Sequence, residues 1–284
     1  MRRGRFLRAV LVGGLVALIG LLAWWALRPA PDENAGPANG FNPGDFVKAR
    51  PRLDAPYVVT DNDVVDAMLA LADVRPNEKL LDLGSGDGRI PIAAARTRGA
   101  RGLGVDIDPA RIREATANAA AAGVGHRVQF RREDLFRTPL GDADILTLYL
   151  SQAINIRLRD RILAEMRPGA RVVSHDFDMA EWRPDQRQQI GTAGVYLWIV
   201  PARVSGRWAM SIGGQNAVLS IDQRYQQFTG ALELGGQSSR IEQGRISAAN
   251  IRFIIRIGGQ RRVFEGRLQG NQLVGENWRA VRAG

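Results

Sequence analysis

The chain has 284 residues, enough for one large domain or two of ordinary size, and its 45% content of hydrophobic residues excludes global disorder. The absence of cysteine excludes disulfides, thiol catalysis and cysteine-ligated zinc, and two histidines are too few for a histidine-based metal site without carboxylate help. The formal net charge of +10 comes from the two ends, because residues 31–204 carry 23 basic and 24 acidic side chains, and this near-neutral centre argues against nucleic acid as a partner.

The N-terminal residues 1–28 are expected to form a transmembrane anchor. Residues 9–27 form an uncharged run of 19 residues, close to the ~20 that a membrane-spanning helix needs. A cleaved signal peptide has a shorter apolar core and a small-residue cleavage site. Here the run is longer and has no clean cleavage site, and Trp24-Trp25 lie near its far end, as interfacial aromatic residues do, which favours an uncleaved anchor. The five prolines of residues 29–52 predict a linker.

Residues 53–204 alternate between helix and strand signals. A first helix is expected from a cap at Thr60 or Asp61 to Ala72, with apolar residues at the spacing of one buried face. The alternation predicts an α/β domain with a Rossmann-like, parallel, doubly wound sheet that binds ligands at the carboxyl edge of its strands. The expected strands are 79–82, 102–106, 127–131, 143–150 and 170–176, and the later expected helices are 89–98, 109–122 and 154–166.

The segment Asp82-Leu83-Gly84-Ser85-Gly86-Asp87-Gly88 is the strongest functional signal in the chain. It joins a buried strand directly to a helix, so bare backbone lies beside a helix N-terminus that attracts a carboxylate or a phosphate. The next strand ends at Asp106, about 20 residues after the loop, where a carboxylate can accept hydrogen bonds from the two hydroxyls of a ribose. Together the two features predict a nucleoside-binding domain.

The spacing of the glycines indicates which nucleoside is bound. The dinucleotide fingerprint is Gly-x-Gly-x-x-Gly, whereas this loop reads Gly-x-Gly-x-Gly and resembles the loop of class I S-adenosylmethionine-dependent methyltransferases. The resemblance implies that S-adenosyl-L-methionine is the cofactor, with its methionine end at Asp82 and the loop, its ribose at Asp106 and its adenine near Asp134 and Leu135. A turn cap is the alternative role for Asp134. The implied cofactor contacts are Asp82, Gly84, Ser85, Gly86, Gly88, Asp106, Ile107, Asp134 and Leu135.

Two strand ends supply candidates for the reaction centre. Tyr149, at the end of strand 143–150, is either a lining residue of a substrate channel or a half-buried strand tyrosine. His175, at the end of strand 170–176, is either a general base or, with Asp176 and Asp178, part of a loop brace. Methyltransferases that act on base amines or on glutamine usually have Asn-Pro-Pro and an aromatic residue after the first of these strands. The chain lacks that motif, which disfavours those substrates.

Residues 205–284 differ in character from the preceding domain. Helical periodicity is replaced by short alternating segments, which are divided by glycine-bearing pairs suited to hairpin turns. Roughly eight strands fit into this region, which favours a small closed barrel or a strongly curled meander, with Trp208 and Trp278 filling its core. The clearest strand segments are 217–222, 226–234, 250–256 and 261–269, and the turn pairs are Gly213-Gly214, Gly235-Gly236, Gly258-Gly259 and Gly270-Asn271.

A wider pattern over residues 53–184 resembles the membrane-anchored protein-lysine methyltransferases of the FAM173 type. It comprises Pro56-Tyr57-Val58-Val59-Thr60, the glycine loop, and Gly169–Ser174 followed by Trp182. The resemblance implies transfer of a methyl group to a lysine amine of a protein. Val59 stands where that family tends to have proline, and Asp106 where it more often has glutamate. A small-molecule or lipid-linked acceptor, or a cofactor-binding protein without catalysis, remain the alternatives.

Two observations give opposite predictions for the side of the membrane on which the catalytic domain lies. Four arginines precede the apolar run, whereas Arg28 follows it with Asp32 and Glu33, a distribution that favours an inside N-terminus and an outside catalytic domain. S-adenosylmethionine is made inside cells, however, and an enzyme without its cofactor is inactive. We therefore expect a bacterial inner-membrane anchor with the catalytic domain in the cytoplasm.

Overall fold

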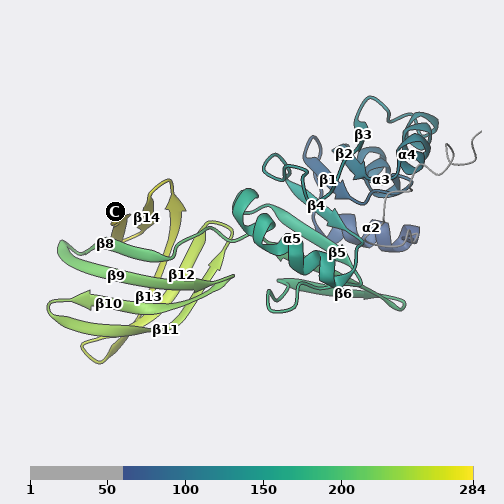
Figure 1. Ribbon diagram of the computed structural model, residues 1–284. Coiled ribbons are helices and arrows are strands. Elements are labelled where there is room, and N and C mark those ends of the chain that lie inside the picture. The colour runs from purple at the N-terminus through teal and green to yellow at the C-terminus, as the bar shows by residue number, and fades with distance from the viewer. Residues whose placement is uncertain (1–59, 284) are drawn as a thin grey trace, which may run out of the picture. The chain divides into compact units, whose positions relative to one another are not determined.

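The computed structural model describes residues 60–283, which form an α/β domain followed by an antiparallel barrel (Figure 1). The predicted anchor and linker lie outside the described residues. Within residues 60–283, no helix is both long enough and apolar enough to cross a membrane.

The α/β domain contains the predicted elements in the predicted order. α2 begins after Asp61, as expected, but the Asp61 side chain makes no capping hydrogen bond. Two strands after residue 176, β6 and β7, are additional to those predicted. The elements are α2 (Asn62–Leu71), β1 (Lys79–Leu83), α3 (Arg89–Arg98), β2 (Arg101–Asp106), α4 (Pro109–Ala121), β3 (Val128–Arg132), β4 (Ile145–Leu148), α5 (Gln152–Glu165), β5 (Arg171–His175), β6 (Gln186–Ile190) and β7 (Ala193–Ile199).

The sheet is mixed, so the prediction of a parallel sheet is wrong at one edge. Its strand order is β3-β2-β1-β4-β5-β7-β6. The strands from β3 to β5 pair in parallel, as expected for strands joined by crossover helices, but β7 pairs antiparallel with β5 and β6 with β7. β6 has four exposed polar residues followed by Ile190 and shows no alternation, because as an edge strand it buries little on either face.

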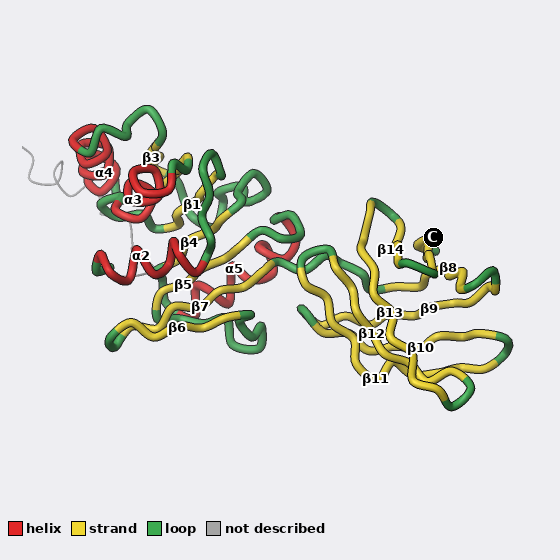
Figure 2. Tube along the Cα trace, turned by 180° about the vertical axis from the view of Figure 1, so that it is seen from behind, coloured by secondary structure: helices red, strands yellow, loops and turns green. Residues whose placement is uncertain are grey.

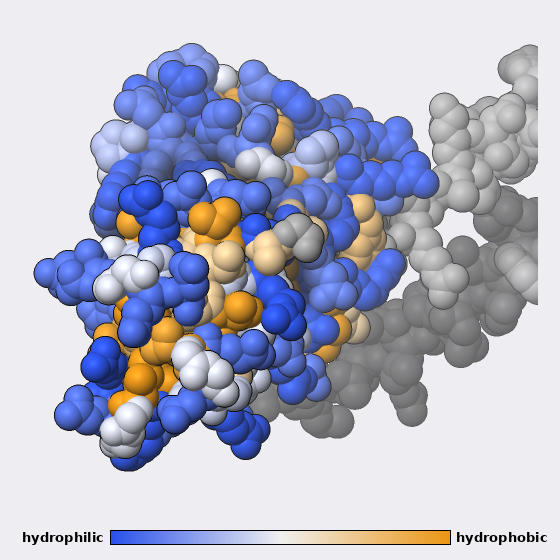
Figure 3. All heavy atoms as spheres, turned by 90° about the vertical axis from the view of Figure 1, so that its left-hand side faces the viewer, coloured by the Kyte–Doolittle hydropathy of each residue, from blue (hydrophilic) through white to orange (hydrophobic). Residues whose placement is uncertain are grey.

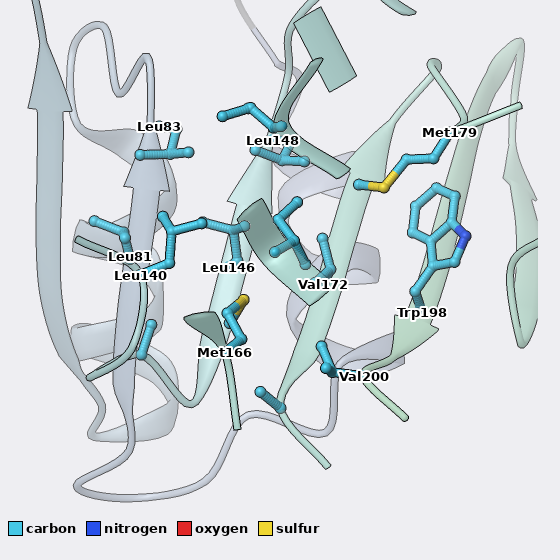
Figure 4. Close-up of a cluster of buried hydrophobic side chains, with 14 of the residues drawn as sticks. Leu81, Leu83, Leu140, Leu146, Leu148, Met166, Val172, Met179, Trp198 and Val200 are labelled. Carbon is cyan, nitrogen blue, oxygen red and sulfur yellow. The ribbon is translucent and has the colours of Figure 1, made fainter. Parts of the chain in front are cut away.

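Apolar side chains cover both faces of this sheet. Figure 2 shows its strands in yellow, with α2 in front of them and α5 behind. On one face, α5 contributes Leu158 and Ile162 to a cluster with the central strands, and the cluster continues to Trp198 of β7 (Figure 4). On the other face, Met68 and Leu69 of α2 and Ile90 of α3 pack against the sheet. This double covering explains why β1 and β4 have nearly continuous apolar sequences. It leaves the strand ends as the places where polar side chains gather.

The C-terminal region is a closed barrel of eight antiparallel strands. The sequence predicted either such a barrel or a curled meander, and the structure has the barrel. Both glycines have positive φ in the Gly213-Gly214, Gly235-Gly236 and Gly258-Gly259 turns, which matches the twist of two-residue hairpins. The strands are β8 (Gly206–Ile212), β9 (Gln215–Arg224), β10 (Gln227–Leu234), β11 (Gln237–Ser247), β12 (Asn250–Ile257), β13 (Gln260–Gln269), β14 (Gln272–Gly275) and β15 (Trp278–Arg282).

Aromatic side chains fill the inside of the barrel. Trp208 and Trp278 are both buried there, which confirms their predicted role as core residues. Phe253 stacks on Phe264 with ring centroids 4.9 Å apart, and Trp278 meets both rings edge-on. The Trp278 indole lies against Gly275, where a Cβ atom would come within 2.0 Å of its Nε1. The barrel therefore has a solid core.

The outside of the barrel carries the arginine excess seen in the sequence. Some of these arginines pair with carboxylates along the strands, as Arg252 does with Glu265 at 3.1 Å and Arg256 with Glu242 at 2.6 Å. The face seen in Figure 3 is mainly hydrophilic, with apolar side chains gathered in part of it. The exposed ion pairs of Arg252 and Arg256 contribute little to the stability of the barrel.

Candidate functional site

The glycine loop after β1 turns sharply at the carboxyl edge of the sheet. Gly84, Gly86 and Gly88 have φ values of 75°, 52° and 81°, a region that residues with a side chain rarely adopt. The N–H groups of Gly84 and Ser85 both donate to the Val105 carbonyl at 2.9 Å, so the loop is fastened to the end of β2. Gly88 is the N-cap residue of α3. The loop therefore presents backbone beside a helix N-terminus, as the sequence predicts.

Asp106 faces this loop from the end of β2. Its Oδ2 accepts a hydrogen bond from the Gly86 N–H at 3.0 Å, and its Oδ1 accepts one from the Asp108 N–H at 2.9 Å. These two bonds fix the carboxylate in one orientation. Each oxygen accepts one of these bonds and keeps a further lone pair, so the group is suited to receive the two hydroxyls of a ribose.

Asp82 lies beneath the loop and is almost fully buried. Its Oδ1 accepts a hydrogen bond of 2.6 Å from the hydroxyl of Thr147 on the neighbouring strand β4. Burial raises the pKa of Asp82 from an ordinary 3.8 to about 7; the Thr147 bond opposes the rise, and Asp106 and Asp87 add to it. Asp106 and, in its ionised form, Asp82 thus favour a ligand with positive charge beside the loop.

The other predicted cofactor residues lie around the same edge. Ile107 follows Asp106 and is 37% exposed. Asp134 caps a turn, because its Oδ1 accepts a hydrogen bond from the Phe136 N–H at 2.8 Å. Leu135 is partly buried against the core. The hydroxyl of Ser85 is buried against Gly104 and has no hydrogen-bond partner within the described part of the chain.

Tyr149 and His175, predicted separately from two strand ends, are stacked on one another. Their ring centroids are 3.9 Å apart with an interplanar angle of 26°. The imidazole is held on both sides: Nδ1 lies 3.3 Å from the Thr60 hydroxyl and Nε2 lies 3.3 Å from Asp176 Oδ2. Burial lowers the pKa of His175 although Asp176 and Asp61 oppose the change, so the ring is neutral near pH 7. Burial, followed by the same two carboxylates, raises the pKa of Tyr149.

Arg89 connects the glycine loop with the Tyr149–His175 pair. Its Nη2 pairs with Asp87 Oδ2 at 2.5 Å, and its Nη1 donates to the Thr60 carbonyl at 2.7 Å. The same Thr60 contacts His175 through its hydroxyl. Thr60, two residues before α2, therefore connects the two halves of the site, a role that was not predicted because Thr60 was considered only as a cap.

The segment after β5 contains two predicted acids and one residue, Phe177, to which no role was assigned from the sequence. Asp176 has a positive φ of 60° and is bonded twice to Gly194 of β7, through its N–H at 2.7 Å and its Oδ1 at 2.8 Å. Asp178 accepts hydrogen bonds from Gln152 and from the Ala180 N–H. Both carboxylates thus brace the loop, one of the two roles foreseen for them. An apolar residue between two acids, Phe177, was the sequence signal that went unused.

Three comparisons with known proteins agree with this geometry. The ANTKMT methyltransferase domain family matches residues 82–186. A protein-lysine N-methyltransferase of Saccharolobus islandicus is 36% identical over 51% of this chain and 93% of its own length, and the adenine nucleotide translocase lysine N-methyltransferase of Mus musculus is 34% identical over 61% and 74%. A crystal structure titled as an RNA methyltransferase from Salinibacter ruber, bound to S-adenosyl-L-homocysteine, is 48% identical, covers 52% of this chain and 96% of its own, and has a TM-score of 0.51.

Fold, glycine loop and similarity together define a class I S-adenosylmethionine-dependent methyltransferase. The residues fit that cofactor: the fastened loop offers backbone, Asp106 offers two oriented oxygens, and the carboxylates around Asp82 match a ligand that carries a sulfonium and an ammonium group. Within this class the chain belongs to the ANTKMT-type methyltransferase family.

Proposed function

We propose that the enzyme transfers a methyl group to a lysine amine of a protein substrate. The observation that carries the proposal is the surface around the Tyr149–His175 stack, where Asp61 and Asp176 lie close enough to act on both rings. Aromatic rings beside carboxylates attract an ammonium group. The two lysine methyltransferases described above support the same acceptor by similarity.

His175 is suited to receive, through the Thr60 hydroxyl that lies 3.3 Å from its Nδ1, the proton that the amine must lose before it attacks. An unperturbed lysine has a pKa near ~10.4 and is protonated at neutral pH. The imidazole is neutral because burial lowers its pKa, and Asp176 would stabilise the charge it gains. When bound, S-adenosylmethionine supplies an activated methyl group, so the protein has to align the amine, exclude water and remove one proton.

For the cofactor we propose the contacts that the sequence suggested: Asp82 and the glycine loop at the methionine end, Asp106 at the ribose, and Ile107, Asp134 and Leu135 near the adenine. The exposure of Ile107 beside Asp106 supports an apolar contact there. The cap that Asp134 makes to Phe136 uses one of its two carboxylate oxygens and is compatible with a second role.

RNA is a second candidate acceptor, since the similar Salinibacter ruber structure is titled an RNA methyltransferase. The charges at the reaction centre oppose it. Asp61 and Asp176 would repel the phosphates that flank any base, and RNA binding depends strongly on neutralising those phosphates. We therefore rank a protein amine above RNA.

The full-length enzyme with labelled S-adenosylmethionine and a cell extract tests the acceptor. Label is expected in protein and is expected to disappear when the lysines of the extract are blocked beforehand by acetylation, which leaves no amine lone pair to be methylated. An Asp106→Ala enzyme is the matched control for label that does not depend on the cofactor site. Label that runs with RNA or lipid, or that persists on lysine-blocked protein, would reject the lysine acceptor; an absence of turnover in every fraction would favour a binding protein.

We also propose that residues 9–27 hold the enzyme at a bacterial inner membrane, with the catalytic domain in the cytoplasm where its cofactor is made. The apolar run and its flanking arginines support an anchor. Reporter fusions after Gly284 give a direct test. A fluorescent protein is expected to mature there, whereas an active alkaline phosphatase would place the domain outside.

A further inference from the structure

Phe177 combines an exposed side chain with a backbone that is held rigidly. The residue is 39% exposed. Its N–H donates to the His175 carbonyl at 2.7 Å, and its own carbonyl accepts hydrogen bonds from Ser174 Oγ at 2.7 Å and from Asn155 Nδ2 at 2.9 Å. Both backbone groups of the residue are therefore fixed.

The groups that hold Phe177 come from the protein interior. Asn155 of α5 and Ser174 of β5 are fully buried, and they are also hydrogen-bonded to each other at 3.1 Å. Burying an amide and a hydroxyl is costly unless they are hydrogen-bonded. Two polar groups in an otherwise apolar layer thus serve to position the main chain of one exposed aromatic residue.

The place of Phe177 in the sheet separates it from the cofactor contacts. Between residues 60 and 204, Ile107 and Phe177 are the large apolar residues that stand out as exposed, and each follows a strand at the carboxyl edge. Ile107 follows β2 and Phe177 follows β5, three strand spacings apart, or roughly 14 Å. Ile107 lies beside the ribose-binding Asp106, whereas Phe177 lies two residues from His175 on the acceptor side.

We propose that Phe177 is a specificity residue that packs on the acceptor protein, against an apolar side chain next to the target lysine. The inference rests on the proposed lysine acceptor and specifies which lysines the enzyme prefers. An aromatic ring on a fixed main chain binds an apolar group at little cost in conformational entropy, because the loop is already ordered. Acceptor lysines with an apolar neighbour are therefore methylated in preference to lysines between polar residues.

Two synthetic peptides that differ only in the neighbours of a single lysine, leucine in one and serine in the other, test this with the full-length enzyme. The wild type is expected to show a lower KM for the leucine peptide. Phe177→Ser should raise that KM roughly tenfold and leave kcat and the KM for the serine peptide little changed, and Phe177→Leu should restore most of the preference. Val281→Ser, which alters an exposed apolar residue of the barrel, is the matched control.

Equal KM values for the two peptides in the wild type, or an equal effect of Phe177→Ser on both, would overturn the proposal. Unchanged affinity of Phe177→Ser for S-adenosylhomocysteine is required, because a loss would show a disturbed cofactor site instead. If the extract assay gives label on lysine while the peptides show no preference, this inference alone fails. If no lysine is labelled in either assay, the proposed function fails with it.

Discussion

Replacing Asp82 by asparagine should remove a titration that makes the ligand-free protein less stable as the pH rises. In the folded chain burial raises the pKa of this carboxyl to about 7, from an ordinary 3.8. Between these two values the folded state holds a proton that the unfolded state has released, so stability falls with increasing pH. At 1.36 kcal/mol per tenfold change, the complete loss is about 4 kcal/mol.

The asparagine variant keeps the shape of the side chain and an oxygen that can accept the Thr147 hydroxyl, but it never carries a charge. Above pH 7 it should therefore be more stable than the wild type by a few kcal/mol, and the two should converge as the pH falls towards 4. Denaturant unfolding of ligand-free protein between pH 5.5 and 8.5 measures the difference. Within this window the wild type should lose about 2 kcal/mol on reaching pH 7.

Asp144→Asn is the control, because folding lowers the pKa of Asp144 whereas it raises the pKa of Asp82. Burial acts to raise the pKa of Asp144, but the hydrogen bond from the Lys79 N–H and the Arg167 guanidinium lower it overall. The ionised carboxylate stabilises the fold fully above its unfolded pKa, and this stabilisation is lost only in stronger acid. The Asp144→Asn variant should therefore be less stable than the wild type by the same amount at every pH between 5.5 and 8.5.

Cofactor binding gives a second measurement. A cationic ligand favours the ionised form of Asp82, so the affinity of the wild type for S-adenosylmethionine should rise up to about pH 7, and the Asp82→Asn variant should lose that dependence. A wild type whose stability does not change with pH, or a variant with the same slope, would refute the reasoning.

Three further substitutions test other parts of the structure. Asp106→Ala should weaken cofactor binding roughly tenfold to hundredfold by calorimetry, and unchanged affinity would contradict the ribose assignment. His175→Gln should lower kcat roughly hundredfold without affecting cofactor affinity, and should flatten the fall of activity in acid that protonation of the imidazole causes in the wild type; an unaltered pH profile would argue for a purely structural histidine. Gly275→Ala should destabilise the barrel by about 2–3 kcal/mol because its Cβ would overlap Trp278, whereas Gly213→Ala, in open space, should cost only ~1 kcal/mol.

The cofactor side of the site was predictable because its signals are local. Strand, glycine turn, helix and the acid at the next strand end follow one another between Lys79 and Asp106, and the backbone angles that Gly84 and Gly86 adopt are those that select glycine. The barrel was predictable for the same reason, since three of its hairpin turns consist of two adjacent glycines.

The acceptor side depends on contacts between distant parts of the chain. Tyr149 and His175 could be named from their strand ends, but their stacking depends on side-chain rotamers and on Thr60, which lies 115 residues before His175. β6 was missed because an exposed edge strand carries no apolar alternation. Phe177 was missed because its importance lies in buried partners from α5 and β5.

The scarcity of lysine gives the fold a further property. Of 39 basic residues only Lys48 and Lys79 are lysines, and Lys48 lies outside the described residues. Lys79 opens β1, whereas the glycine loop follows the other end of that strand, roughly 16 Å away. The remaining 37 basic residues are arginines, whose guanidinium groups stay protonated and offer no free amine lone pair. With the proposed lysine acceptor, a chain of this composition keeps its net positive charge and still offers only two lysine side chains to a neighbouring copy of itself.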